Sequence, residues 1–226
     1  MPPRRARRTG STAEMGYFSV LLDLTNRHCV MVGGGPIAER RILSLLEAGA
    51  QVTVISPRVT PTLEALAADG RIGLESRHYI EGDLAGADLA FVATAAREVN
   101  LAVTREARAR GVWINAADDP AHCTFILPAV VRRGDLTVAV ATGGTSPALS
   151  RAVREELEGY FTAEYTTLAA LAAEARRELR AAGRAVTAEA WRRALGPEVR
   201  RIIVERGRDT AKLRLLELLG VEACAR

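Results

Sequence analysis

The chain has 226 residues, of which 48% are hydrophobic and 26% are charged, and its formal net charge at pH 7 is +4. This is the composition of an ordinary globular protein, and the length allows one large domain, or somewhat more, with a sizeable core. No apolar run approaches the length of a membrane span and no signal-peptide pattern follows the start, so we expect neither a membrane protein nor a membrane partner.

The positive charge is concentrated in the first fifteen residues, which contain four arginines and one acidic residue. This segment is rich in Pro, Arg and Ser and has no hydrophobic periodicity, so we predict a disordered basic tail over residues 1–15. Met15 resembles a natural start, which leaves open whether residues 1–14 belong to the protein. No aromatic stacking residues accompany the basic tail, and we predict no nucleic-acid partner.

The cysteines and histidines predict neither a disulfide framework nor a metal site. The three cysteines have no metal-binding or C-x-x-C spacing, and the three histidines are scattered singly. Such cysteine usage is typical of a reducing compartment, so we predict a cytoplasmic protein. His122 is the histidine best placed for a functional role, because it lies close to Asp118 and Cys123.

Short strand and helix patterns alternate through the first half of the chain. Apolar, β-branched runs predict strands at residues 29–32, 51–56, 71–75, 88–94 and 112–115. Helical periodicity predicts helices at residues 37–48, 61–68 and 98–110. This alternation predicts an α/β fold with a Rossmann-type, doubly wound parallel sheet.

The pattern changes after Asp119. Apolar strands at residues 124–131 and 136–141, joined by a turn that contains Gly134, predict an antiparallel hairpin that extends the sheet or forms a dimer interface. Ser146 is placed to cap a helix at 147–157, and helices follow at 169–182, 187–194, 197–205 and 210–219. We therefore predict a nucleotide-binding domain at 16–120, a dimerisation and substrate region at 121–158 and a C-terminal helical region at 159–226.

The turn after the first strand has the spacing of a dinucleotide-binding turn. Gly33, Gly35 and Ala38 fit G-x-G-x-x-[G/A]: the first glycine permits the tight turn, the second lets a pyrophosphate approach the backbone, and the alanine lets the helix pack closely. The helix N-terminus offers free N–H groups and a partial positive charge to phosphates. The predicted cofactor-binding residues here are Gly33, Gly34, Gly35, Pro36, Ile37 and Ala38.

Two further strand ends contribute to the predicted cofactor site. An acidic residue after the second strand commonly binds the ribose hydroxyls, but this chain has Ser56, Pro57 and Arg58 there. Arg58 favours a 2′-phosphate, as in NADP, or is simply solvated, so these residues alone leave the choice between NAD and NADP open. Ala93 and Thr94 end the fourth strand at the same edge and are predicted to contact the cofactor.

Adjacent carboxylates follow the fifth strand. Asp118 and Asp119 come shortly after Asn115 and immediately before Pro120. A carboxylate at the mouth of a nucleotide-binding fold is well placed for proton transfer if it is partly desolvated. Asp-Pro is equally typical of a turn or a helix cap, and the residues alone do not decide between the two interpretations.

A second glycine-rich loop, residues 142–147, precedes the helix that Ser146 caps. Such a loop at a helix N-terminus is typical of a site for phosphate or a substrate carboxylate, and Arg151 follows on the helix as a candidate carboxylate partner. The alternative is an ordinary capped helix start with a solvated arginine.

Together these motifs resemble the precorrin-2 dehydrogenase and sirohydrochlorin ferrochelatase family, whose fold forms the N-terminal domain of sirohaem synthases. The resemblance rests on the Gly33–Arg41 turn, on Ala93-Thr94 with Asn100, on Asn115–Pro120 and on Gly143–Pro147, with Tyr17-Phe18 and Phe125–Pro128 beside them. They follow the family's order and spacing over about residues 16–158.

The resemblance implies NAD-dependent oxidation of precorrin-2, a tetrapyrrole, to sirohydrochlorin, with NAD as cofactor and Asp118 as the catalytic residue. It also implies a homodimer, and some members insert Fe²⁺ into the product. Thr142 stands where the family has a phosphate-binding or modified serine. The predicted substrate-binding residues are Asn115, Thr142, Gly143, Gly144, Thr145, Ser146 and Arg151. The alternative function is a nucleotide-sensing regulatory domain without catalytic activity.

Overall fold

The computed structural model describes residues 16–117 and 119–221, which form two compact units with their boundary between Leu127 and Pro128. None of the helices in these two ranges is both long and apolar enough to cross a membrane. The boundaries predicted at 120 and 158 rest on changes in sequence pattern and stay predictions.

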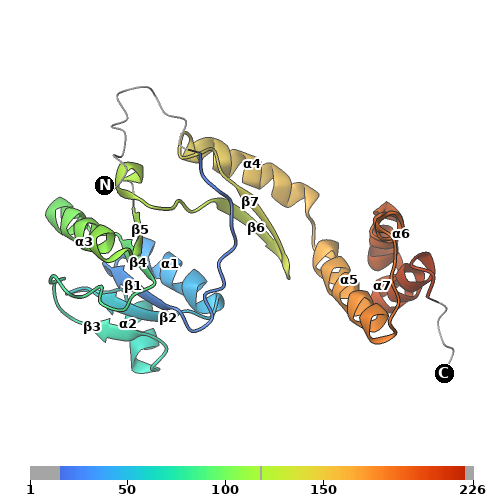
Figure 1. Cartoon of the computed structure of the whole chain (residues 1–226), viewed down its shortest axis with the longest axis horizontal. Coiled ribbons are helices and arrows are strands. Elements are labelled where there is room, and N and C mark those ends of the chain that lie inside the picture. Colours follow the sequence, from blue (N-terminus) through green and yellow to red (C-terminus); the bar gives the residue numbers. More distant parts are fainter. Residues whose placement is uncertain (1–15, 118, 222–226) are drawn as a thin grey trace, which may run out of the picture. The chain divides into compact units, whose positions relative to one another are not determined.

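The first unit is built on a five-stranded parallel sheet in the order β3–β2–β1–β4–β5 (Figure 1). Its strands are β1 (His28–Val32), β2 (Gln51–Ile55), β3 (Gly73–Glu75), β4 (Leu89–Val92) and β5 (Trp113–Ala116). Its helices are α1 (Pro36–Glu47), α2 (Pro61–Ala68) and α3 (Arg97–Arg110), and a 3₁₀ turn, η1 (Pro120–His122), follows β5. This arrangement confirms the predicted Rossmann-type fold.

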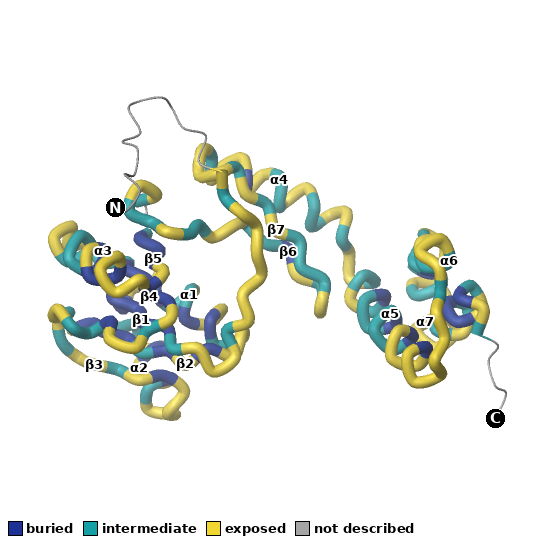
Figure 2. The backbone as a smooth tube through the Cα atoms, in the orientation of Figure 1, coloured by how far each residue is buried: buried dark blue, intermediate teal, exposed yellow. Residues whose placement is uncertain are grey.

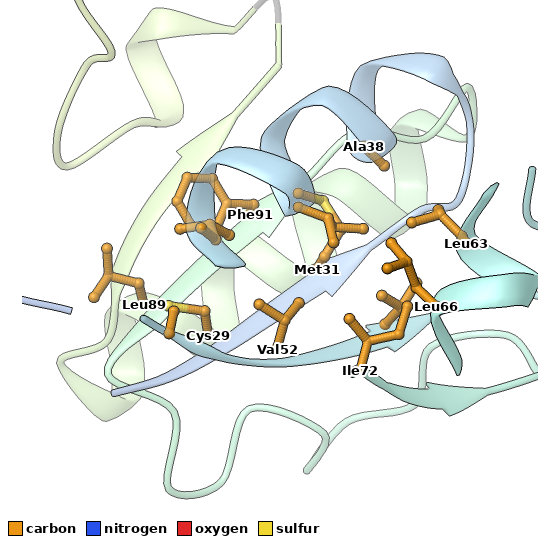
Figure 3. Close-up of a cluster of buried hydrophobic side chains, with 13 residues drawn as sticks. Cys29, Met31, Ala38, Val52, Leu63, Leu66, Ile72, Leu89 and Phe91 are labelled. Carbon is orange, nitrogen blue, oxygen red and sulfur yellow. The ribbon is translucent and has the colours of Figure 1, made fainter. Parts of the chain in front are cut away.

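The two faces of the sheet bury different cores. Because alternate residues of a strand point to opposite faces, Met31 packs with α1 and α2, whereas Val30 packs with α3. Figure 3 shows the first of these clusters, with Ala38 on α1 and Phe91 on β4. The strands coloured dark blue in Figure 2 are therefore covered on both faces. A ligand can reach this part of the sheet only at the ends of its strands.

A buried carboxylate holds the loop between β3 and β4. The side chain of Glu106, on α3, is buried and accepts hydrogen bonds from the Tyr79 hydroxyl, from the N–H of Gly82 at 3.0 Å and Leu84 at 3.3 Å, and from Arg110 Nε at 2.6 Å. Burial by itself raises the pKa of Glu106, but these hydrogen bonds outweigh it, so the pKa is lowered overall. The carboxylate thus takes the place of a crossover helix in fixing this connection.

Replacing Glu106 by glutamine is expected to destabilise the fold by about 2 kcal/mol, because the amide group turns a donor toward donors that then lack an acceptor. The lowered pKa means that the carboxylate stabilises the fold above its ordinary pKa and loses this effect as the pH falls through the folded-state pKa. Urea unfolding at neutral and acidic pH should show the gap between wild type and variant closing in acid. Glu98→Gln, at an exposed position of the same helix, is the control, and equal effects of the two variants would contradict the assignment.

The second unit combines a hairpin with helices. Its elements are β6 (Ala129–Arg133), β7 (Leu136–Val140), α4 (Pro147–Tyr160), α5 (Glu164–Ala181), α6 (Ala188–Ala194) and α7 (Pro197–Leu218). β6 and β7 pair antiparallel, and Gly134 in their turn has a φ of 59°. The hairpin prediction is confirmed, as is Ser146 as the cap of α4.

One element prediction needs correction. The strand predicted at 124–131 is wrong over residues 124–128, because the Thr124 N–H bonds to Ile114 O at 2.8 Å and Pro128 has no N–H for a ladder. The two helices predicted at 197–205 and 210–219 are confirmed as two helical segments of α7, because Gly207 between them has a non-helical φ of 82° and ψ of 175°.

Candidate active site

The carboxyl edge of the parallel sheet carries the first candidate site. The pairing of the strands continues one residue past their ends, since Gly33 N–H bonds to Ile55 O at 3.0 Å and Ala93 N–H bonds to Val32 O at 2.9 Å. The loops after β1, β2 and β4 therefore begin side by side, at the place where ligands of such sheets bind.

The three glycines after β1 each meet a different constraint. Gly33 has a φ of 118°, and a Cβ there would lie 2.4 Å from Ala93 O. A Cβ on Gly34 would lie 2.5 Å from Arg58 O. Gly35 has an ordinary φ of −81° and no described atom within 4 Å of an added Cβ. The fold itself therefore explains two of the glycines, whereas open space lies beside the third.

This open space lies at the N-terminus of α1. Gly35 is the N-cap and makes no side-chain capping bond, Pro36 has no N–H, and the first backbone bond within the helix is donated by Glu39. The N–H groups of Ile37 and Ala38 accordingly have no hydrogen-bond partner among the described residues. Ala38 is fully buried against the sheet, as its place in the motif predicts.

The loop after β2 packs directly on the glycine turn. Ser56 is buried, and its Oγ donates to Arg58 O at 2.6 Å, so this hydroxyl fixes the loop instead of pointing outward. Pro57 and Arg58 are exposed, and the Arg58 guanidinium makes no ion pair or hydrogen bond within the described ranges. The loop after Ile55, residues 56–60, contains no acidic residue, so it offers the ribose a proline, an arginine and backbone groups.

Thr94, after β4, is held by the start of α3. Its Oγ1 donates to Asn100 Oδ1 at 2.7 Å, and Asn100 Nδ2 donates to Thr94 O at 3.0 Å. The predicted contact of Thr94 with a cofactor is therefore limited to its methyl group and backbone. Ala93 packs against Gly33 and forms the floor of the turn.

Asp118, the predicted catalytic residue, lies outside the described residues. Beside it, Asp119 Oδ2 pairs with His122 Nδ1 at 2.7 Å, which engages one of the two adjacent carboxylates. The single S–H proton of Cys123 is shared between Ala116 O and Asp119 O, each 3.3 Å from Sγ, and burial raises the pKa of the thiol. The thiol therefore fixes both flanks of Asp118 as a neutral donor.

Asn115 is buried on the α1 face of β5 and holds the chain that follows. Its Nδ2 donates to Phe125 O at 3.0 Å, while its Oδ1 has no hydrogen-bond partner among the described residues. The amide nitrogen is thus engaged in the fold, and the predicted contact of Asn115 with substrate depends on Oδ1 alone.

The second glycine loop belongs to the second unit and bonds mainly to itself. Thr142 Oγ1 accepts from Ser146 N at 3.1 Å and lies 3.2 Å from Ser150 Oγ, and Ser146 Oγ accepts from Leu149 N at 3.2 Å. Gly143 and Gly144 are exposed with positive φ, and Thr145 Oγ1 donates back to Thr142 O at 2.6 Å. What this loop offers outward is backbone, together with the exposed side chain of Arg151 on α4.

Comparison with known proteins finds similar proteins in sirohaem biosynthesis. A family model described as putative NAD(P)-binding matches residues 20–129, and one described as the central part of sirohaem biosynthesis proteins matches residues 133–160. A sirohaem synthase of Methylobacillus flagellatus is 46% identical over 162 residues, covering 72% of this chain and 35% of that protein. The solved structure of SirC, a precorrin-2 dehydrogenase, superposes with a TM-score of 0.67 at 27% identity, covering 90% of this chain and 98% of SirC. The chain is thus similar to sirohaem synthases over part of their length and to SirC over nearly its whole length.

A second relative aligns with more of this chain. The sirohaem synthase of Methylococcus capsulatus is 38% identical over 215 residues, which is 94% of this chain and 45% of that protein. The chain thus spans less than half the length of these sirohaem synthases and nearly the whole of SirC.

The residues at the sheet edge fit a nicotinamide dinucleotide. Nothing in the described fold requires a glycine at Gly35, and the open space beside it adjoins backbone N–H groups at the N-terminus of α1. The first unit therefore has a site for a nicotinamide cofactor.

The sequence pattern did not predict two contacts within this site. Gly34 is the central residue of the motif and has no fixed role in it, yet the loop after β2 touches it directly. Glu39 and Thr60 lie 21 positions apart and form a hydrogen bond that no spacing rule indicates. Both contacts join residues that are distant in the sequence, so they become visible only in the folded chain.

Proposed function

We propose that the protein is a cytoplasmic, homodimeric precorrin-2 dehydrogenase that oxidises precorrin-2 to sirohydrochlorin with NAD. The observation that carries this proposal is the open space beside Gly35. It follows β1, which lies two strands away from β5, the strand whose end leads to Asp118. A dinucleotide site next to a carboxylate-bearing loop has the two groups that such an oxidation needs, a hydride acceptor and a proton acceptor. Nothing in the comparisons favours the regulatory domain without catalytic activity.

The oxidation removes one hydride and one proton from the tetrapyrrole, and the bound nicotinamide supplies the hydride acceptor. The residues of this chain do the rest. The N–H groups at the start of α1 bind the diphosphate, the glycine turn sets how deep the cofactor lies, and Asp118 accepts the proton. Asp118 needs no metal for this role, and the described residues contain no cluster of His, Cys, Asp or Glu that could hold one.

We assign NAD as the oxidant, although Arg58 is suited to a 2′-phosphate. Arg58 is exposed at the end of a loop whose backbone is fixed at Ser56, so its flexible side chain accommodates a ribose without a phosphate at little cost. Relative rates with NAD and NADP test this choice directly.

The substrate of this family carries carboxylate arms, and the second unit offers groups that suit them. Arg151 is exposed near the N-terminus of α4, beyond the exposed glycines of the 142–146 loop. Arg133 is less suited, because its Nε donates to Phe161 O at 2.5 Å and caps the end of α4. Arg154 is also less suited, because its guanidinium already forms an ion pair with Glu158 at 2.6 Å.

The hairpin supports the proposed homodimer. Within the described ranges α4 packs against β6 and β7, and these two strands pair only with each other, so the outer edges of the hairpin are open to a further strand. A second copy that pairs with such an edge, or that covers the exposed Leu149 of α4, would extend this layer. Sedimentation of the purified protein measures the stoichiometry.

The test is to mix the purified protein with precorrin-2 and NAD without oxygen and to follow the absorbance of reduced nicotinamide. We expect one NADH per sirohydrochlorin formed, with faster turnover for NAD than for NADP. A folded protein that forms no NADH would overturn the proposal. Adding Fe²⁺ afterwards and following the loss of the sirohydrochlorin spectrum, against a control without protein, tests whether the protein also inserts the metal.

A further inference from the structure

Glu39 is an unexpected residue for a helix that receives a diphosphate. It lies in the first turn of α1, one residue after the motif alanine, and is partly buried. The positive end of the helix dipole attracts anions, so a carboxylate this close to the open space beside Gly35 competes with a bound phosphate. We therefore expect the Glu39 carboxylate to have a contact that favours cofactor binding and so offsets this repulsion.

The role is visible in what the carboxylate binds. The Thr60 hydroxyl donates its one proton to Glu39 Oε2. Thr60 Oγ1 also accepts a hydrogen bond from the Leu63 N–H at 3.4 Å, because Thr60 is the N-cap of α2. The Thr60 N–H in turn donates to Gly34 O at 3.0 Å. Glu39 therefore connects the first turn of α1, the start of α2 and the glycine turn through one side chain.

The segment between these contacts is the loop that follows β2. At one end Ser56 Oγ bonds to Arg58 O at 2.6 Å, and at the other end Thr60 is held by Glu39. Between them, Arg58 O and Val59 lie so close to Gly34 that an added Cβ would approach each within 2.5 Å. In dinucleotide-binding folds the end of this strand meets the ribose of the adenosine half.

We infer that Glu39 is a positioning residue of the dinucleotide site, acting through Thr60 to hold the loop after β2 against the glycine turn where the adenosine half binds. The inference rests on the dinucleotide site of the proposed function but not on precorrin-2 as the substrate. It predicts that the side chain matters as a hydrogen-bond acceptor and that its charge opposes binding.

The two effects of Glu39 have opposite signs, which allows a sharp test with ADP-ribose, which has the adenosine and diphosphate of the cofactor but lacks its nicotinamide. Glu39→Gln keeps an acceptor for Thr60 and removes the charge, so we expect ADP-ribose to bind at least as tightly as to wild type. Glu39→Ala removes both, and we expect affinity to fall about tenfold, as for loss of one hydrogen bond to a charged group. If Glu39 acted by charge alone, both variants would bind more tightly.

Thr60→Val should also weaken ADP-ribose binding about tenfold, and the double variant Glu39→Ala, Thr60→Val should bind no more weakly than either single variant, because both remove the same contact. Nicotinamide mononucleotide, which lacks the adenosine half, should bind all variants within about twofold of wild type. With the complete cofactor, the KM should rise while kcat at saturation is unchanged. Urea unfolding separates these effects from any loss of stability through the α2 cap.

Glu64→Ala is the matched control, because Glu64 is an exposed acid in the first turn of α2 whose carboxylate makes no hydrogen bond or ion pair with the described residues. Calorimetric titration that finds Glu39→Ala equal to wild type or tighter, or a wild-type protein that binds no ADP-ribose, would overturn the inference. The proposed function fails by a different result, namely absence of NADH formation from precorrin-2 while the ADP-ribose series behaves as described.

Discussion

Asp118→Asn is expected to lower the turnover of precorrin-2 by about 10²–10⁴-fold, the range that a positioned general base contributes. Asparagine keeps the size and shape of the side chain but accepts no proton at neutral pH. The dinucleotide site lies at the β1 and β2 ends, so the affinity for NADH should stay within about twofold of wild type. Stopped-flow formation of NADH gives the first quantity and fluorescence titration with NADH gives the second.

The neighbouring carboxylate provides the comparison for this variant. Asp119 Oδ2 already binds His122 Nδ1 at 2.7 Å, so its lone pairs are partly occupied within the loop. Asp119→Asn is therefore expected to reduce turnover less than about fivefold, through a loosened η1 turn and not through loss of a base. If Asp119→Asn abolished turnover and Asp118→Asn did not, the two roles would be reversed.

The sequence allowed the parallel sheet to be predicted because its strands are short, apolar and separated by glycine-ended helices. It could not predict residues 124–128 correctly, because an apolar run before Pro128 has the composition of a strand, while its backbone partner, Ile114, lies ten positions earlier. Gly207 was placed correctly between two helical segments, because glycine commonly interrupts a helix and its φ of 82° and ψ of 175° are not helical. Long-range backbone pairing, in contrast, is not encoded in the hydrophobic period.

The candidate site shows the same division. The motif spacing correctly placed Gly33 and Ala38, since their roles are local to one turn and one helix. The inward hydroxyls of Ser56 and Thr94 could not be foreseen, because their partners are set by how each loop folds back. A polar residue at a strand end is predicted equally well as a ligand contact or as a loop anchor, and only the hydrogen-bond partner distinguishes the two.

The two glycines that frame the turn should respond differently to the same added methyl group. Gly33→Ala places a Cβ 2.4 Å from Ala93 O on a residue with a φ of 118°. Backbone shift and strain together are expected to cost about 3 kcal/mol of unfolding free energy. Gly35→Ala meets no described atom within 4 Å and keeps an ordinary φ. Its stability should therefore stay within about 1 kcal/mol of wild type, the cost of alanine at an N-cap.

Binding should show the reverse order among the variants that fold. In Gly35→Ala the methyl group occupies the space into which the diphosphate must come, beside the N–H groups of Ile37 and Ala38. Displacing the diphosphate from those donors removes charge-assisted hydrogen bonds, and we expect NADH affinity to fall about 10²-fold. Urea unfolding and NADH titration of the same preparations separate the two effects. A Gly35→Ala protein that folds and binds NADH as wild type does would mean that the open space beside Gly35 is not where the diphosphate binds.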